Sequence, residues 1–235
     1  MASLTTSAPA DFTAVKAGKR AHVLMVFAPK GGVGKTTLAS NMVVAAARAG
    51  HSVAGLDFDG QRAFTTWAAD RHEHPGVPSE FQIEVRGAHI EDWRSELHLV
   101  RRRDVVVIDT PPGVERRNQV PLQEIGAIAD VILMPTEVYG GSMRYVVDFL
   151  SWWESRPGRT LLVLNKTIAG RSLNREAREF LSVRGDVWPD SLPLRDDIAR
   201  AFDCGLAAAD DDKIPGNTNF AALWHLCAGR MGVAT

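Results

Sequence analysis

The sequence predicts a doubly wound α/β domain, in which helices cover both faces of a mostly parallel sheet. The first observation is that short apolar runs alternate with helix-length segments along most of the chain. The second is that some runs are almost continuous Val and Ile, such as residues 105–108, which is typical of strands buried on both faces of a parallel sheet. Ligands of such folds bind beyond the carboxyl ends of the strands, so the motifs at those ends are the informative ones.

The expected elements follow this alternation. Residues 1–20 are rich in Ala, Ser and Thr and show no sustained period, so a disordered tail is expected there, followed by one domain over residues 21–235. Strands are expected at 22–28, 52–58, 81–86, 104–109, 130–135 and 160–165, with a weaker one near 187–194. Helices are expected at 36–49, 62–73, 89–101, 119–128, 141–155 and 172–184, and a final amphipathic helix at 218–231.

Length, composition and charge are ordinary for a soluble globular protein. The chain has 235 residues, of which 45% are hydrophobic and 23% charged, and its formal net charge is −1. Because the chain is close to neutral, any binding of nucleic acid needs a local basic patch. Cys204 and Cys227 lie far apart without metal-ligand spacing and are expected to be reduced thiols. No run reaches the ~18 apolar residues of a membrane span and no signal peptide is evident, so a cytoplasmic protein is expected.

A glycine-rich loop follows the first expected strand and precedes a helix-like stretch. In a strand–loop–helix unit of this kind, glycines let backbone N–H groups close around phosphate oxygens. Lys35 is placed to reach the terminal phosphates, and the Thr36 hydroxyl to ligate Mg²⁺. The strict phosphate-loop pattern fails at Pro29, where it requires glycine. The alternative is a plain glycine-rich turn. The nucleotide-binding candidates in this loop are Lys30, Gly31, Gly32, Val33, Gly34, Lys35, Thr36 and Thr37.

The segment KGGVGKTT, with its additional lysine, resembles the deviant Walker A motif of the ParA/MinD superfamily of ATPases. The resemblance extends over residues 22 to about 206 and implies the P-loop NTPase fold, with ATP and Mg²⁺ as cofactors. It also implies a homodimer bridged by two ATP molecules, in which Lys30 reaches across the interface to the partner's nucleotide.

Two carboxylates, Asp57 and Asp59, close the second expected strand. Their roles are expected to differ, with one carboxylate facing the phosphates while the other supports the loop. The segment resembles the family's D-x-D-P-Q motif, with Gly60 in place of the proline, which implies that Asp59 positions the attacking water. Its continuation, residues 62–67, resembles the short plasmid partition ATPases that lack an N-terminal DNA-reading domain. Taken alone, the motif could equally be a solvated loop.

Two further polar residues end apolar strands. Asp109 follows residues 105–108 and precedes a Thr-Pro-Pro-Gly turn, where an acid can hold Mg²⁺ through a water, opposite Thr36. This segment resembles the family's Walker B region, and the following loop, 114–120, is expected to sense the γ-phosphate. Asn165 offers an amide donor and acceptor to an adenine edge, as in related ATPases, or it caps the next turn, and both readings stay open.

The resemblance implies slow, Mg²⁺-dependent ATP hydrolysis that a partner protein stimulates, with Lys30, Lys35 and Asp59 as the catalytic residues. The last residues lack the basic and bulky apolar side chains of a MinD-type membrane helix, so no membrane partner is expected. The ParA branch then implies plasmid or chromosome segregation, or positioning of a cellular cargo such as a chemoreceptor cluster or microcompartment. Its dimer is expected to bind the nucleoid and to be released by a ParB-like or small adaptor protein. A regulatory ATPase of a protein machine, without DNA binding, is the alternative from a different class.

Non-specific contacts to duplex DNA are expected from basic residues between positions 156 and 200, where nine basic residues stand against six acidic ones. The candidates are Arg171, Arg175, Arg178, Arg195 and Arg200. The first three have spacings of four and three and therefore share a helical face. Two subunits joined by ATP would double the number of phosphate contacts. A solvated helix, balanced by its own glutamates, is the alternative.

Overall fold

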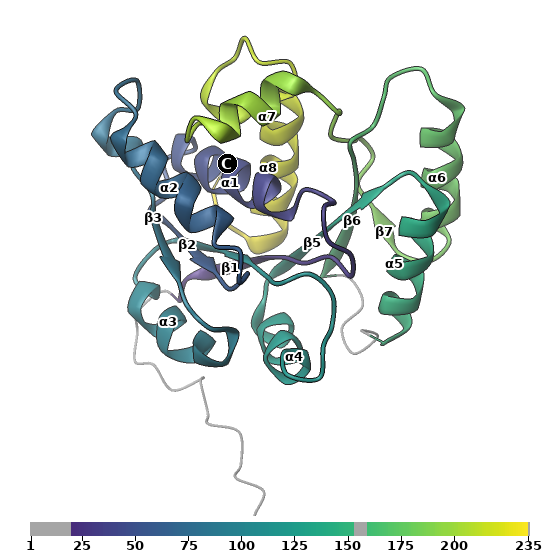
Figure 1. Cartoon of the computed structure of the whole chain (residues 1–235), viewed down its shortest axis with the longest axis horizontal. Coiled ribbons are helices and arrows are strands. Elements are labelled where there is room, and N and C mark those ends of the chain that lie inside the picture. Colours follow the sequence, from purple (N-terminus) through teal and green to yellow (C-terminus); the bar gives the residue numbers. More distant parts are fainter. Residues whose placement is uncertain (1–19, 153–158, 235) are drawn as a thin grey trace, which may run out of the picture.

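The computed structural model describes residues 20–152 and 159–234, and its centre is a parallel sheet of seven strands (Figure 1). The strand order is β3-β2-β4-β1-β5-β6-β7, and every pair in it is parallel. The predicted α/β fold is confirmed, with a sheet that is fully rather than mostly parallel. The strands are β1 (His22–Val26), β2 (Val53–Asp57), β3 (Glu84–Gly87), β4 (Val105–Asp109), β5 (Val131–Glu137), β6 (Thr160–Asn165) and β7 (Asp186–Val187).

The register of the central strands brings their polar ends to one edge of the sheet. Asp57 at the end of β2 and Val26 at the end of β1 are both opposite Asp109 at the end of β4. On the other side of β1, Glu137 of β5 is opposite Asn165 of β6. The residues that the sequence singled out at strand ends therefore lie along the carboxyl edge, where doubly wound sheets bind their ligands.

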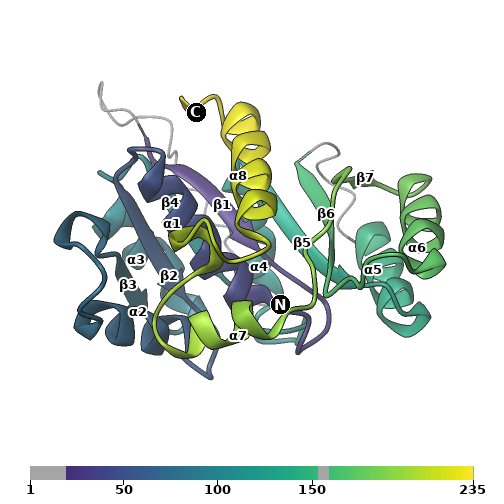
Figure 2. The ribbon, with the colours of Figure 1, turned by 90° about the horizontal axis from the view of Figure 1, so that it is seen from above.

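Helices cover both faces of the sheet (Figures 1 and 2). Alternate residues of each strand point to opposite faces, so Leu24 of β1 packs into one hydrophobic cluster and Met25 into the other. The first cluster includes side chains of α1 (Lys35–Arg48), α2 (Ala63–Glu73), α7 (Asp196–Asp203) and α8 (Asn217–Met231). The second includes side chains of α3 (Trp93–Val100), α4 (Gln119–Ile128), α5 (Gly140–Trp152) and α6 (Ser172–Ser182).

Three expected elements differ most in position or extent from the structure. Residues 79–81 form a short 3-10 helix, η1 (Ser79–Phe81), and β3 starts only at Glu84, later than predicted. The helix expected from residue 89 starts as the 3-10 helix η2 (Ile90–Asp92) before α3. The weak strand near 187–194 is reduced to the two residues of β7 and one bridge between Thr167 and Pro193, because prolines in this stretch cannot donate to a ladder.

Two helices between β7 and α8, α7 and the 3-10 helix η3 (Ala208–Asp210), were not predicted from the sequence. A signal was present, because two aspartates open the first turn of α7 and Ile198 and Ala201, three residues apart, face the core. The tail predicted at 1–20 falls outside the described residues except for Arg20, and the helix predicted to reach residue 155 is described to 152. Among the described helices, none is long and apolar enough to cross a membrane.

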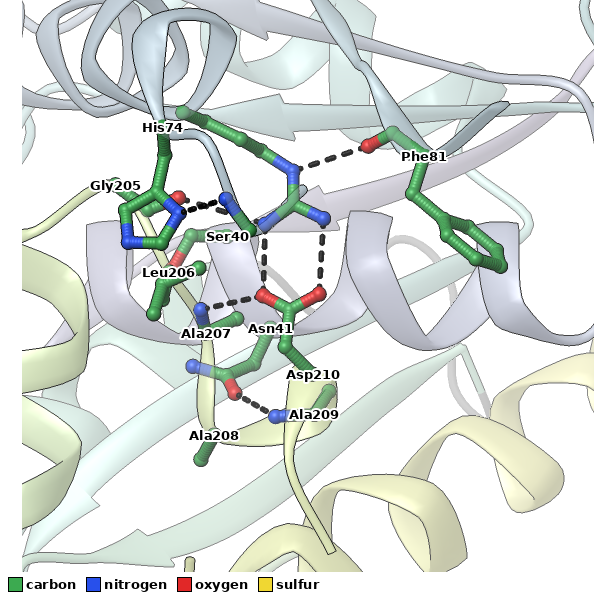
Figure 3. Close-up of polar contacts among 12 residues, drawn as sticks. Ser40, Asn41, His74, Phe81, Gly205, Leu206, Ala207, Ala208, Ala209 and Asp210 are labelled. Atoms are coloured by element: carbon green, nitrogen blue, oxygen red, sulfur yellow. Dashed lines mark hydrogen bonds and ion pairs between the residues drawn. The ribbon is translucent and has the colours of Figure 1, made fainter. Parts of the chain in front are cut away.

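Buried polar contacts attach the segment after α7 to α1 and α2 (Figure 3). The guanidinium of Arg71, on α2, is fully buried and makes two hydrogen bonds of 2.7 and 2.9 Å to the Asp210 carboxylate. It also donates to the Phe81 carbonyl at 3.0 Å. On α1, the Asn41 side chain accepts a hydrogen bond from the N–H of Ala209 at 3.1 Å. These contacts fix the C-terminal half of α2 against a segment far away in the sequence.

Candidate nucleotide-binding site

The glycine-rich loop joins β1 to α1 at the carboxyl edge of the sheet. Gly32 and Gly34 have φ angles of 76° and 88°, in the left-handed region that side chains rarely adopt. A Cβ atom on Gly34 would also lie 2.5 Å from Nδ2 of Asn165. Within the described residues, no side chain caps the N-terminus of α1. The first backbone N–H groups of α1 therefore remain available to an anion such as phosphate.

Thr36 and Asp109 meet between α1 and β4. The Thr36 hydroxyl donates a hydrogen bond of 2.7 Å to Oδ2 of Asp109. Asp109 is fully buried, and its Oδ1 has no hydrogen-bond partner among the described residues. A buried acceptor without a partner is costly, and a carboxylate beside a hydroxyl supplies the oxygen ligands that Mg²⁺ prefers. The two residues therefore fit a magnesium ion, and metal binding here stays a prediction.

Burial raises the pKa of Asp109 to about 7, because desolvation disfavours the charged form. The hydrogen bond from Thr36 and the positive charge of Lys35 act in the opposite direction. Lys35 is itself buried, with only 6% of its surface exposed. A divalent cation at this carboxylate would favour its ionised form.

Asp57 and Asp59 have different surroundings. Asp57 is fully buried, and its carboxylate accepts hydrogen bonds from the N–H and the hydroxyl of Thr65, both at 2.9 Å, and from the N–H of Asp59 at 3.0 Å. Asp59 is partly exposed, and its Oδ1 accepts a hydrogen bond from the N–H of Gln61 at 3.0 Å. Asp57 therefore supports the loop, and Asp59 is the carboxylate that solvent can reach. The role of Asp59 toward water stays a prediction.

Asn165 contacts the glycine-rich loop directly. Its Nδ2 donates to the Val33 carbonyl at 2.7 Å, and its Oδ1 accepts from the N–H of Lys166 at 2.9 Å. Asn165 thus caps the turn after β6 and supports the loop, while contact with a base stays a prediction. Lys166, which the sequence analysis had not placed at this site, donates to the Gly32 carbonyl at 2.5 Å and pairs with Glu137 at 3.1 Å. The sequence signal that could have placed Lys166 at the site is its position directly after Asn165.

Gly113, the residue directly before the loop predicted to sense the γ-phosphate, lies beside the residues that precede the glycine-rich loop. The N–H of Gly113 donates to the Ala28 carbonyl at 3.1 Å, and a Cβ atom on Gly113 would lie 3.3 Å from the Pro29 carbonyl. Val114 is exposed, as is Lys30 at the start of the glycine-rich loop. The exposed position of Lys30 is compatible with contact to a second chain, and that contact stays a prediction.

The arginines predicted to contact DNA have different surroundings. Arg178 donates to the backbone carbonyls of Trp188 and Asp190, so its guanidinium holds the loop after β7. Arg195 forms an ion pair with Asp197 at 2.9 Å. Arg195 is nevertheless exposed, as are Arg171, Arg175 and Arg200, and Arg175 lies 3.9 Å from Glu179. Of the three arginines predicted to share a helical face, Arg171 is the N-cap that precedes α6, and Arg178 binds backbone carbonyls. Arg171 and Arg175 are therefore the two of these that a phosphate can reach.

A comparison with protein-family models matches residues 24–206 to the CobQ/CobB/MinD/ParA nucleotide binding domain. The chain belongs to this family. The match includes the glycine-rich loop and the carboxyl ends of β2, β4 and β6, so the candidate site lies wholly within the CobQ/CobB/MinD/ParA domain. A comparison with curated proteins finds no match.

Several solved structures have a similar fold. MinD cell division protein from Aquifex aeolicus is 22% identical, with a TM-score of 0.70 over 89% of this chain and 98% of that chain. A putative plasmid partition protein from Borrelia burgdorferi B31, bound to AMPPNP, is 15% identical, with a TM-score of 0.66 over 88% of this chain and 98% of that chain. The pNOB8 ParA bound to nonspecific DNA is 18% identical, with a TM-score of 0.59 over 90% of this chain and 99% of that chain. At these identities the likeness shows the fold.

Proposed function

We propose that this chain is a ParA-type ATPase that dimerises with ATP, binds DNA without sequence preference and partitions or positions a cargo, most simply a plasmid or chromosome. The observation that carries the nucleotide chemistry is the pair formed by Thr36 and the fully buried Asp109, next to the glycine-rich loop. Membership of the CobQ/CobB/MinD/ParA nucleotide binding family supports the same chemistry.

Each residue of the site has a defined role in this proposal. The loop N–H groups and Lys35 bind the β- and γ-phosphates, and Thr36 with Asp109 would hold Mg²⁺, which supplies positive charge that stabilises the transferring phosphoryl group. Asp59 orients a water that attacks the γ-phosphorus in line, so the bond to the β–γ bridging oxygen breaks and ADP and phosphate leave. Lys30 contacts the nucleotide of the partner subunit, which couples dimerisation to ATP.

The DNA-binding part of the proposal rests on exposed positive charge and on the fold shared with a ParA bound to nonspecific DNA. Arg171, at the N-terminus of α6, and Arg175, one turn later, are exposed. An ATP dimer presents this pair twice. A ParB-like or small adaptor protein would then stimulate hydrolysis and release the dimer from the nucleoid in the cytoplasm. The same cycle can serve a cellular cargo, such as a chemoreceptor cluster or a microcompartment.

A second candidate is a regulatory ATPase of a protein machine that does not bind DNA. The observation that favours it is that Arg178 donates to backbone carbonyls of its own chain and that Arg195 pairs with Asp197. Both contacts lower the positive charge that is available to DNA phosphates. Both candidates share the nucleotide site and differ only in what the ATP dimer binds.

Binding to a random-sequence duplex, measured by fluorescence anisotropy with ATP or ADP over a range of salt concentrations, separates the two candidates. Binding that requires ATP and weakens steeply with salt supports the partition proposal. Arg171→Ala with Arg175→Ala removes four proposed phosphate contacts per dimer. The slope of the logarithm of the binding constant against the logarithm of salt concentration should then become shallower by up to about 3.6. Arg101→Ala with Arg102→Ala removes the same charge elsewhere on the exposed surface and should leave the slope unchanged. No binding at low salt with ATP favours the protein-machine candidate.

A further inference from the structure

Arg62, at the start of α2, has an unusual backbone conformation. Its φ and ψ are 57° and 26°, in the left-handed region. Among the described residues, only Arg62 and Lys166 combine a positive φ with a side chain. A side chain in this region is unfavourable unless its surroundings hold it there, and such positions are concentrated at functional sites. The contacts that hold Arg62 therefore indicate what the conformation is for.

The guanidinium of Arg62 joins the ends of two neighbouring strands. Its Nη1 donates to the carbonyl of Asp57, the last residue of β2, and to the carbonyl of Ala88, directly after β3, at 2.8 Å. The side chain crosses Gly87, where a Cβ atom would lie 3.2 Å from Cδ of Arg62. The fold therefore leaves space at the end of β3 for this arginine.

The same residue closes the turn that carries Asp59. The N–H of Arg62 donates to the carbonyl of Asp59 at 3.1 Å. From the other side, the N–H of Asp59 donates to the buried carboxylate of Asp57 at 3.0 Å. Asp59 is thus held between Asp57 and Arg62 through its own backbone, while its carboxylate stays partly exposed.

The far end of α2 is fixed independently. Arg71 is hydrogen-bonded to Asp210 and to the Phe81 carbonyl. In the first turn of the helix, Thr65 is hydrogen-bonded to Asp57. Because these contacts do not involve Arg62, loss of its side chain is expected to loosen the turn without releasing the helix.

We propose that Arg62 is a positioning residue for Asp59. Its guanidinium donates hydrogen bonds to carbonyls at the ends of β2 and β3 and so holds the turn. The turn in this position directs the Asp59 carboxylate toward the carboxyl edge of the sheet, where the glycine-rich loop lies. This inference rests on the proposed role of Asp59 in orienting water. It assigns Arg62 no contact with the nucleotide, so its effect should be on the rate of hydrolysis and not on ATP affinity.

The test is single-turnover hydrolysis of labelled ATP by the full chain, together with nucleotide titration and thermal unfolding. Arg62→Gly removes the guanidinium while glycine adopts the left-handed conformation without strain. It should keep wild-type ATP affinity and lower the hydrolysis rate about 10- to 100-fold, the range expected when a reacting group is misplaced by about 1 Å. Arg62→Lys retains a charged donor and should recover part of the rate.

Arg159→Ala is the matched control, because Arg159 donates to the Ala127 and Ala129 carbonyls, at the opposite edge of the sheet before β6. It should lower the melting temperature without changing the hydrolysis rate. If Arg62→Gly does not fold, Arg62→Lys decides: a reduced rate with wild-type ATP affinity supports the proposal, and a wild-type rate overturns it.

A double variant separates positioning from general stabilisation. Adding Arg62→Gly to Asp59→Ala should leave the residual rate unchanged, because Arg62 acts through Asp59. A further loss by the same factor as in the wild-type background would make the role merely structural and overturn the proposal. If Asp59→Ala is slow but Arg62→Gly hydrolyses at the wild-type rate, only this inference fails. If Asp59→Ala itself hydrolyses at the wild-type rate, the proposed role of Asp59 fails as well.

Discussion

Replacing Asp109 by asparagine should stabilise the chain in the absence of metal and nucleotide. Burial raises the pKa of Asp109 from the ordinary value of 3.8 to about 7, so the folded chain binds a proton that the unfolded chain has released between these pH values. Stability is therefore lost as the pH rises through this window. At 1.36 kcal/mol per pH unit, the loss above pH 7 reaches about 4 kcal/mol, and Asp109→Asn removes it.

Urea unfolding at pH 5 and pH 8, without Mg²⁺ and nucleotide, measures this effect. The free energy of unfolding of Asp109→Asn minus that of wild type should increase by about 3 kcal/mol between the two pH values. Asp57→Asn is the matched control. Its carboxylate accepts three hydrogen bonds, so this change should destabilise the chain, by about 1–3 kcal/mol.

The same variant should weaken Mg²⁺-dependent nucleotide binding, because an amide is a poorer partner for the cation than a carboxylate. Nucleotide titration with and without Mg²⁺ measures this. A stability difference that does not change between pH 5 and pH 8 would refute the account of a buried, uncompensated carboxylate. A stabilised variant with unchanged Mg²⁺ dependence would remove Asp109 from the metal site.

The remaining predictions concern three basic residues. Lys35→Ala should abolish nucleotide binding, because the β- and γ-phosphates lose their charge partner, and unchanged affinity in a nucleotide titration would discard the phosphate-loop assignment. Lys30→Ala should retain ATP binding but lose ATP-dependent dimerisation and hydrolysis, and an ATP dimer with normal turnover in light scattering would exclude contact across the interface. Arg71→Ala should cost about 3–5 kcal/mol of unfolding free energy, because it leaves the Asp210 carboxylate without its buried partner. A loss below about 1 kcal/mol in urea would contradict that role.

Much of the candidate site could be predicted because its residues lie next to strand ends. Thr36 and Asp109 were expected to face each other, since a loop after β1 and the end of β4 meet at one edge of a parallel sheet, and the structure joins them by a hydrogen bond. This inference needed only local pattern and the general geometry of the fold. Alternation along an extended chain does not separate Asp57 from Asp59, because residues two positions apart point to the same side. Their surroundings differ because β2 ends at Asp57, whereas Asp59 lies in the turn that Arg62 closes.

The residues that were missed depend on contacts between distant segments. Nothing in the sequence marks Arg62 as left-handed, because its conformation is stabilised by carbonyls at the ends of β2 and β3. Arg71 reaches Asp210 across 139 positions, and no periodicity reports such a pair. Arg178 shares a helical face with exposed arginines, but the carbonyls that it binds belong to the loop after β7.

The central claim is that ATP joins two copies of this chain and that hydrolysis separates them. Light scattering on Asp59→Ala, with Mg²⁺ and either ATP or ADP, tests it most directly, because the variant should bind ATP without consuming it. The account predicts twice the mass of one chain with ATP and the mass of one chain with ADP. The mass of one chain under both conditions, with ATP binding confirmed by titration, would contradict it.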